Sequence, residues 1–312
     1  MDGESGGVRV QRLPEGEGAG ALFVVATPIG NLEDMTPRAI RILREVDLIA
    51  AEDTRRTRQL LSRFGIRNRL VSHHEHNRRA SGRELIRLLE EGRRIALVTD
   101  AGTPGVADPG AELIAEAASR NIPVIPVPGP SAALAALVAS GLPTDRFLFA
   151  GFPPRGSRQL EAFLDGLEAE KGTIVLYEAP HRLQRTLAAL AGRWPGRRMA
   201  LARELTKLHE EIVRGTVAEV AEYAAQHPAL GEYCLVLEGA KDRPVPAKSG
   251  DPGAPGEDGS ARPWWSGLSI AEHVARYERE TGDRKEAMRM AAKDRGMARR
   301  DVYRALLESR EK

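Results

Sequence analysis

A loop of small residues between two regular elements constrains the fold of this chain more than any other feature. Residues 95–98 form an apolar run typical of a buried strand, and the loop after it holds three glycines and two prolines before it ends at Gly110. Within the loop, Asp108 and Pro109 indicate the start of a helix, with Asp as the N-cap and Pro at the first helical position. A strand-to-helix connection needs only about 2–6 residues, and open α/β sheets bind ligands at the carboxyl ends of their strands. We therefore predict a binding loop here rather than a plain turn.

The composition limits the class of protein. A length of 312 residues suggests about two domains, and a net charge of +2 means that any basic surface must be local. The single cysteine, Cys234, cannot form an internal disulfide, which fits a reducing compartment. The sequence has no apolar stretch of about 18 residues and no signal-peptide pattern at its start. We therefore expect a cytoplasmic protein with no membrane partner.

Strand and helix patterns alternate along residues 21–141 and continue, with a higher share of strands, along residues 142–240. In the first region, the runs that predict strands lie at 21–26, 48–51, 70–72, 95–98 and 124–127. In the second region, they lie at 147–150, 173–177, 199–202, 211–213 and 233–237. The alternation predicts a mostly parallel sheet in the first domain, and the extra strands predict a mixed sheet in the second. The expected fold class is α/β, with two α/β domains and a small helical C-terminal segment.

The remaining segments differ in composition. Residues 1–20 are rich in Gly and Glu and are expected to be a disordered tail. Residues 241–265 contain five prolines and four glycines and are expected to be a linker. Residues 266–312 show helical spacing, and from Thr281 onward they hold ten Lys/Arg against six Asp/Glu, a net charge of +4. Basic helices joined by short turns suggest nucleic-acid binding, but a small helical bundle with a solvated charged surface explains the pattern equally well.

Polar groups follow the predicted strands of the first domain at the points where the strands end. They lie at residues 27–31, 52–55, 74–77, 100–104 and 128–132. Because the carboxyl ends of parallel strands meet at one edge of a sheet, we expect these groups to converge there. No glycine-rich fingerprint follows the first strand and no P-loop motif exists, which excludes an ordinary dinucleotide site and a P-loop NTPase. The three histidines between residues 73 and 76 lack the spacing of metal ligands, so no metal site is expected.

Eight motifs in order make the chain recognisable. They are Thr27-Pro-Ile-Gly-Asn-Leu32, Ala51-Glu-Asp-Thr-Arg55, His74-Glu-His-Asn77, Asp100-Ala-Gly-Thr-Pro104, Asp108-Pro-Gly110, Pro128-Gly-Pro-Ser131, Tyr177-Glu178 with His181-Arg182, and Ala202-Arg-Glu-Leu-Thr-Lys207. In order and spacing, this series resembles the bacterial 16S rRNA cytidine 2′-O-methyltransferases of the tetrapyrrole-methylase-like (class III) family. The resemblance covers about residues 21–240 and extends to helical motifs at 285–287 and 300–303.

The resemblance implies that a homodimer binds S-adenosylmethionine in a cleft between two α/β domains. The positions that match the family's cofactor-binding residues are Pro28, Asp100, Ala101, Gly102, Thr103, Pro104, Val106, Ser131, Ala132 and Tyr177. Small residues such as Gly102 suit a close approach of the backbone to the cofactor, and Val106 suits packing against adenine. Ser131 could equally be a helix N-cap, or could serve both purposes.

Methyl transfer to a ribose hydroxyl depends mainly on positioning and electrostatics, but a 2′-hydroxyl is a poor nucleophile that a proton acceptor helps. The catalytic candidates are Glu52, Asp53, Glu204 and, if its pKa is lowered, Lys207. The two acids after the second strand could instead pair with Arg55 or Arg56.

Other polar residues suit the substrate. The candidates on the substrate side are Asn31, Arg55, His74, Asn77 and Arg203. The arginines at 56, 58, 63, 67 and 69 suit an RNA backbone or a solvated helix face.

With this resemblance, we expect S-adenosylmethionine-dependent 2′-O-methylation of a cytidine in 16S rRNA of the 30S ribosomal subunit. The basic segment at 266–312 would help to engage the ribosomal substrate. One alternative is a methyltransferase of the same superfamily that acts on a tetrapyrrole precursor. The other is a regulator that senses a ligand through its α/β part and reads DNA through a helix-turn-helix.

Overall fold

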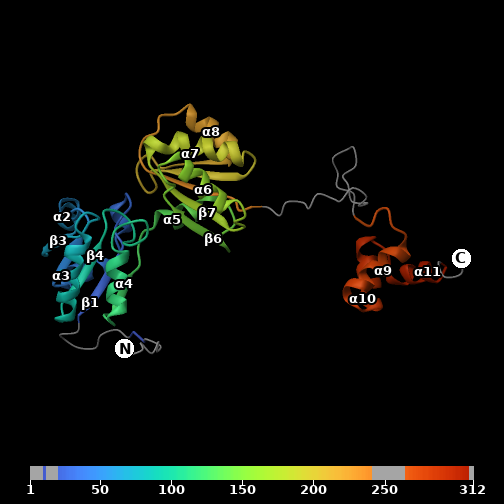
Figure 1. The fold of residues 1–312 in the computed structure, drawn as a ribbon, viewed down its shortest axis with the longest axis horizontal. Coiled ribbons are helices and arrows are strands. Elements are labelled where there is room, and N and C mark those ends of the chain that lie inside the picture. The colour runs from blue at the N-terminus through green and yellow to red at the C-terminus, as the bar shows by residue number, and fades with distance from the viewer. Residues whose placement is uncertain (1–9, 12–19, 241–263, 309–312) are drawn as a thin grey trace. The chain divides into compact units, whose positions relative to one another are not determined.

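The computed structural model describes residues 10–11, 20–240 and 264–308, and the chain divides into two compact units, Met1–Lys241 and Asp242–Lys312. Within the described residues, the first unit contains two five-stranded sheets with their helices, and the second contains three helices (Figure 1). Most of the expected tail at 1–20 and of the expected linker at 241–265 lies outside the described residues.

The first sheet is entirely parallel, as the alternation of strands and helices predicts. Its strand order is β3-β2-β4-β1-β5. The strands are β1 (Ala21–Val25), β2 (Leu48–Ala51), β3 (Leu70–Ser72), β4 (Arg94–Val98) and β5 (Val124–Val127). Both faces of the sheet are covered by helices, so β2 is buried at every position and lacks polar–apolar alternation.

Amphipathic helices cover the two faces of this sheet. The helices α1 (Pro37–Glu45) and α2 (Thr54–Arg63) pack on one face, and α3 (Arg78–Glu90) and α4 (Ala111–Ser119) pack on the other. In α3, for example, Leu85, Ile86 and Leu89 fall on one stripe at helical spacing and are buried against the sheet. The arrangement leaves β3 at the sheet edge, between α2 and α3.

The second sheet is mixed, as predicted, with the order β6-β7-β10-β8-β9. The strands are β6 (Phe147–Gly151), β7 (Thr173–Glu178), β8 (Arg198–Arg203), β9 (Glu211–Thr216) and β10 (Tyr233–Leu237). Only β6 and β7 pair in parallel, and the other neighbours are antiparallel. The helices α6 (Ser157–Leu167), α7 (Pro180–Arg193) and α8 (Val217–Ala225) contribute to the core on one face.

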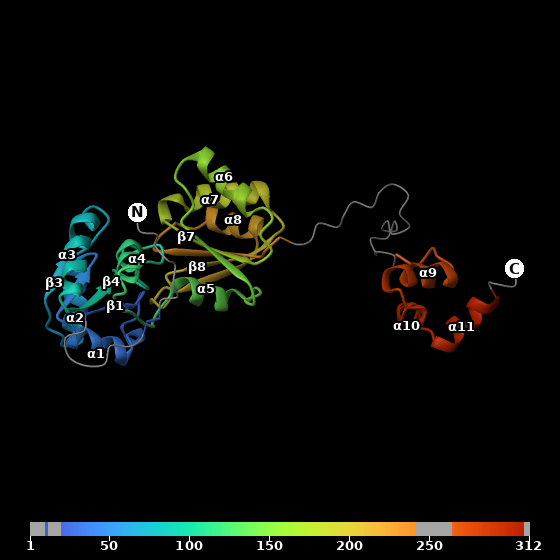
Figure 2. The ribbon, with the colours of Figure 1, turned by 60° about the horizontal axis from the view of Figure 1, so that its bottom comes forward.

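The helix α5 (Ala132–Ser140) covers the other face of the second sheet, although it directly follows the last strand of the first sheet (Figure 2). Its residues Ala133, Ala136 and Leu137 pack against Val175 and Val236. The chain therefore passes from one sheet to the other within residues 128–131. This crossing brings the carboxyl edge of the first sheet up against the second sheet.

The second unit is a three-helix cluster of α9 (Ile270–Thr281), α10 (Arg284–Asp294) and α11 (Arg299–Glu308), as the helical spacing predicts. A small core that includes Val274, Ala291 and Val302 holds it together. Among the residues that the structure describes, no helix is both long and apolar enough to cross a membrane.

Candidate active site

A cavity of about 470 Å³ lies at the carboxyl edge of the first sheet, within the first unit. Its walls come from the loops after β1, β2 and β4, from the start of α5, and from β7, β8 and β10 of the second sheet. Its volume lies within the range of about 300–1,000 Å³ typical of small-molecule sites. Polar groups after β2 and β4 and at the start of α5 line this cavity, whereas the predicted group at 74–77 does not.

Most of the predicted cofactor-binding residues line this cavity. They are Asp100, Ala101, Gly102, Thr103, Val106, Ser131, Ala132 and Tyr177. Pro28 and Pro104 are not among the lining residues, because both are buried in the loops behind it. Of the predicted catalytic residues, Glu52 lines the cavity, whereas Asp53, Glu204 and Lys207 do not.

The loop after β4 is held in place by an isolated backbone bridge to the loop after β1. The N–H of Thr27 donates to the carbonyl of Gly102 at 2.9 Å, and the N–H of Gly102 donates back to the carbonyl of Thr27 at 3.0 Å. Gly102 has φ +83°, which disfavours residues with a side chain. The glycine therefore serves the shape of the loop itself.

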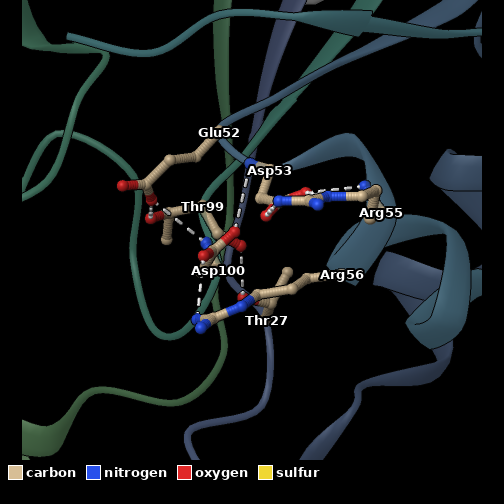
Figure 3. A network of polar contacts seen from close by, with 7 residues as sticks. All are labelled: Thr27, Glu52, Asp53, Arg55, Arg56, Thr99 and Asp100. Atoms are coloured by element: carbon tan, nitrogen blue, oxygen red, sulfur yellow. Dashed lines mark hydrogen bonds and ion pairs between the residues drawn. The ribbon is translucent and has the colours of Figure 1, made fainter.

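Two carboxylates fix the first residues of the same loop (Figure 3). One oxygen of Glu52 accepts hydrogen bonds from the Thr99 hydroxyl at 2.7 Å and from the Asp100 N–H at 3.3 Å. The Asp100 carboxylate accepts from the Asp53 N–H at 3.2 Å and from the Arg56 guanidinium at 3.0 Å. Burial, followed by the nearby charge of Glu52, raises the pKa of Asp100.

Asp53 and Arg55 form the ion pair that the sequence left open as an alternative. Asp53 is the N-cap of α2 and accepts the Arg55 N–H at 2.8 Å, and its second oxygen lies 3.2 Å from the Arg55 guanidinium. Hydrogen bonding from the Arg55 side chain is the main reason why the pKa of Asp53 is lowered. Both side chains are engaged in shaping the start of α2.

Glu204 and Lys207 lie in the turn after β8, next to the cavity residue Glu232. The Lys207 ammonium is 2.8 Å from Glu204 Oε1 and 2.9 Å from Glu232 Oε2. Burial alone would lower the pKa of Lys207, but the hydrogen bonds with Glu204 and Glu232 raise it. The condition under which Lys207 could be a proton acceptor, a lowered pKa, is therefore not met.

The turn after β8 also meets the loop of the predicted substrate residue Asn31. The Asn31 N–H donates to the Thr206 hydroxyl at 3.1 Å. A Cβ on the neighbouring Gly30 would lie only 2.4 Å from Cγ of Lys207, so glycine permits this close approach. This contact joins the loop after β1 to the turn after β8, beside the cavity.

Two of the other predicted substrate residues form hydrogen bonds with backbone groups of nearby loops. The Asn77 amide donates to the carbonyl of Ser72 at 3.0 Å and accepts from the N–H of His74 at 2.8 Å. Arg203 donates to the carbonyl of Leu230 at 2.8 Å. None of these side chains, nor those of Asn31 and Arg55, lines the cavity.

Asp108 is a cavity residue that the sequence assigned to a different role. The prediction that it caps the following helix is wrong, because α4 begins at Ala111 with Gly110 as the N-cap. Gly110 has φ +121°, and a Cβ there would lie 2.7 Å from a methyl group of Leu97, so only glycine fits this turn. Asp108 instead lines the cavity, where burial, followed by the charge of Glu52, raises its pKa to about 7.

Tyr177 ties the cavity to α5. Its hydroxyl accepts the N–H of Ala133 at 3.0 Å, in the first turn of that helix, while Ser131 occupies the N-cap position without a side-chain capping bond. Burial raises the pKa of Tyr177 to about 12, so the phenol stays protonated. Phe149 and Phe152 pack edge-on against its ring, with centroids 4.9 Å and 5.5 Å away.

The chemistry of the lining favours a positively charged ligand with an apolar part. Its charged side chains are Glu52, Arg56, Asp100, Asp108, Glu178 and Glu232. Three of the five acids have a basic partner, because Asp100 pairs with Arg56, Glu178 with Arg182 and Glu232 with Lys207. Glu52 accepts only neutral donors, from Thr99 and Asp100, and supplies most of the unpaired negative charge, which low-dielectric walls strengthen. Ile29, Val106 and Leu205 supply apolar surface on the same cavity.

Comparison with known sequences gives one family over most of the chain. Residues 21–221 match the model of the Tetrapyrrole (Corrin/Porphyrin) Methylases. A Halalkalibacterium halodurans protein named ribosomal RNA small subunit methyltransferase I is 45% identical over 293 residues, which is 94% of this chain and 96% of that protein. A protein of the same name from Bacillus subtilis is 44% identical over 91% of this chain and 93% of its own length. Another from a Synechocystis strain is 44% identical over 93% of this chain and 98% of its own length.

Solved structures show the same fold at lower sequence identity. Diphthine synthase superposes with a TM-score of 0.54 at 15% identity, covering 70% of this chain and 90% of its own. The methyltransferase CobJ superposes with a TM-score of 0.53 at 23% identity, covering 72% of this chain and 97% of its own.

Proposed function

This chain belongs to the ribosomal RNA small subunit methyltransferase I family, within the tetrapyrrole methylases, and on that premise we propose that it methylates 16S rRNA. The reaction is transfer of a methyl group from S-adenosylmethionine to the 2′-oxygen of a cytidine ribose. The observation that carries the proposal is the identity of 45% to a protein of that name, which extends over more than nine-tenths of both chains.

The residues of the cavity fit S-adenosylmethionine. When bound, this cofactor supplies an electrophilic methyl group on a positively charged sulfonium. The acidic lining complements that charge and the charge of the amino group, and Ile29, Val106 and Leu205 offer apolar surface to an adenine ring. In this proposal, Asp100 and the backbone of 101–104 hold the polar parts of the cofactor, with Ser131, Ala132 and Tyr177 on the opposite side.

We assign the acceptor of the 2′-hydroxyl proton to Glu52 and Asp108. Both line the cavity, and the Thr99 hydroxyl donates to Glu52 at 2.7 Å. Burial, followed by the charge of Glu52, raises the pKa of Asp108 to about 7, so Asp108 is an acceptor poised near neutral pH. Asp53, Glu204 and Lys207 then act as positioning residues for the loops around the cavity.

The proposal extends to the substrate and the assembly. The substrate is the 30S subunit in the cytoplasm, and the enzyme acts as a homodimer. Asn31, His74, Asn77 and Arg203 stand on the substrate side, and α9–α11 help to engage the ribosomal particle. The support is that the curated relatives are named for the RNA of the small ribosomal subunit.

Incubation with labelled S-adenosylmethionine and unmodified 30S subunits tests this function directly. We expect label on a ribose 2′-oxygen of a cytidine in 16S rRNA, mapped by nuclease protection and mass spectrometry. Transfer to a tetrapyrrole precursor but not to 30S subunits would overturn the proposal. So would a protein that binds no cofactor and loses binding to duplex DNA when residues 266–312 are deleted.

A further inference from the structure

Residues 54–87 carry an unusual concentration of positive charge. They contain ten arginines against two glutamates, a local net charge of +8 in a chain whose total is +2. In the structure they make up α2, β3, α3 and the connections between them, apart from the last three residues of α3. A local excess of this size is not needed for the fold, because the buried residues of α2 and α3 are small or apolar ones such as Leu61 and Leu85.

Hydrogen bonds and ion pairs divide these arginines into two groups. Four are paired with acids, for example Arg78 with Glu112 and Arg87 with Glu84 and Glu91. The other six are exposed, and their guanidinium groups form no ion pair or hydrogen bond in the described part of the chain, although the charge of Arg69 helps to lower the pKa of Glu84. They are Arg58, Arg63, Arg67, Arg69, Arg79 and Arg83, and we call them the arginine surface.

The arginine surface wraps around one edge of the first sheet. The strand β3 is the edge strand, α2 packs on one face of the sheet and α3 on the other. Figures 1 and 2 both show α2, β3 and α3 together at this end of the sheet. The ten residues of α2 extend about 15 Å at 1.5 Å per residue. Because Arg56 in the first turn of α2 lines the cavity, the surface begins beside the candidate active site.

The spacing of arginines along α3 does not stabilise the free protein. Arg79, Arg83 and Arg87 follow one another at intervals of four along α3, and like charges at this spacing repel each other. Of these three, only Arg87 forms ion pairs, with Glu84 in the same helix and with Glu91 at its C-cap. A guanidinium group matches a phosphate with two parallel hydrogen bonds, so a polyanion would supply the missing partners.

We propose that the arginine surface binds the phosphate backbone of the RNA substrate, which assigns RNA binding to the first unit and not only to the C-terminal helices. The inference rests on the proposed function for the identity of the RNA. The binding of phosphates by these arginines can be tested separately from the identity of the RNA, because the affinity for a polyanion falls with salt concentration in proportion to the number of phosphate contacts. Each contact contributes roughly 0.7–0.9 to the slope of log affinity against log salt concentration.

The test compares two triple variants of the full chain in binding to unmodified 30S subunits at several salt concentrations. The first is Arg58→Gln, Arg63→Gln and Arg83→Gln. The matched control is Arg120→Gln, Arg146→Gln and Arg193→Gln. It removes the same number of positive charges, but from arginines outside the arginine surface that already have acidic partners. We expect the first variant to lower the salt slope by about 2–3 and to weaken binding about tenfold or more. The control should keep the slope of the unaltered protein.

Two further measurements make the outcome decisive. Melting temperature and calorimetric affinity for S-adenosylmethionine should be unchanged in the first variant, and Arg→Lys replacements at the same positions should restore the salt slope. Equal weakening by both triple variants, or an unchanged slope in the first, would overturn the inference. If the unaltered protein fails to methylate 30S subunits, the proposed function fails instead, whereas normal methylation with an unchanged slope in the variant defeats only the arginine surface.

Discussion

Replacing Asp108 with Asn tests whether a carboxyl group in the cavity is held protonated by its surroundings. Asp108 has a pKa of about 7 in the folded chain, against an ordinary value of 3.8, because it is buried and lies near the charge of Glu52. The folded state therefore binds this proton more tightly than the unfolded state. At about 1.4 kcal/mol for each pKa unit, the difference corresponds to roughly 4 kcal/mol, and partial solvent screening reduces it to about 2–4 kcal/mol.

The sign follows from the number of protons bound in each state. Below about pH 4, Asp108 is protonated in both states and contributes no difference. As the pH rises from 4 to 7, the unfolded chain loses the proton while the folded chain keeps it, so the free energy of unfolding falls over this window. Above about pH 7 the loss is complete and stays constant. Asn copies the neutral acid in size and cannot ionise, so Asp108→Asn should escape this loss.

The assay is thermal unfolding of both proteins from pH 4.5 to 8, together with single-turnover methylation over the same range. We expect the melting temperature of the variant to exceed that of the unaltered protein by an amount that grows with pH, to several degrees at pH 8. The unaltered enzyme should gain rate as the pH rises through about 7, and the variant should lack this gain and be much slower than the unaltered enzyme above about pH 7. A difference in melting temperature that does not vary with pH would refute the argument, as would an unchanged pH–rate profile.

Three further substitutions or deletions probe separate parts of the site. Gly102→Val should reduce calorimetric affinity for S-adenosylmethionine strongly, since φ +83° costs a β-branched residue about 1–3 kcal/mol and the bridge to Thr27 must shift; undiminished affinity would count against this loop as a cofactor wall. Glu52→Gln should lower the single-turnover rate by about 10²-fold or more while changing cofactor affinity much less, and a rate like that of the unaltered enzyme would remove Glu52 from the acceptor pair. Ending the chain after Ala240 should weaken binding to 30S subunits more than binding to S-adenosylmethionine, whereas an equal loss of both would indicate that α9–α11 are needed for folding.

The sequence by itself determined the secondary structure and the edge at which the site lies. Apolar runs alternating with helical stripes are local patterns, so they specify parallel strands such as β2 and β4 and helices such as α3 without knowledge of distant contacts. Chain direction alone then places Glu52, Asp100 and Ser131 at the carboxyl edge of one sheet or just beyond it. The order of the motifs also specified the family, which the comparisons confirmed.

Burial, charge pairing and packing between the sheets were decided only by the tertiary structure. The pKa of Asp108 depends on Glu52 and Glu232, and that of Lys207 on Glu204 and Glu232, all brought together by folding. Whether Arg58 or Arg78 is paired depends on which acids lie within reach in space, and Arg78 meets Glu112 of α4. The physical reason is that desolvation and Coulomb interactions act over a few ångströms in three dimensions, and separation along the chain does not report that distance.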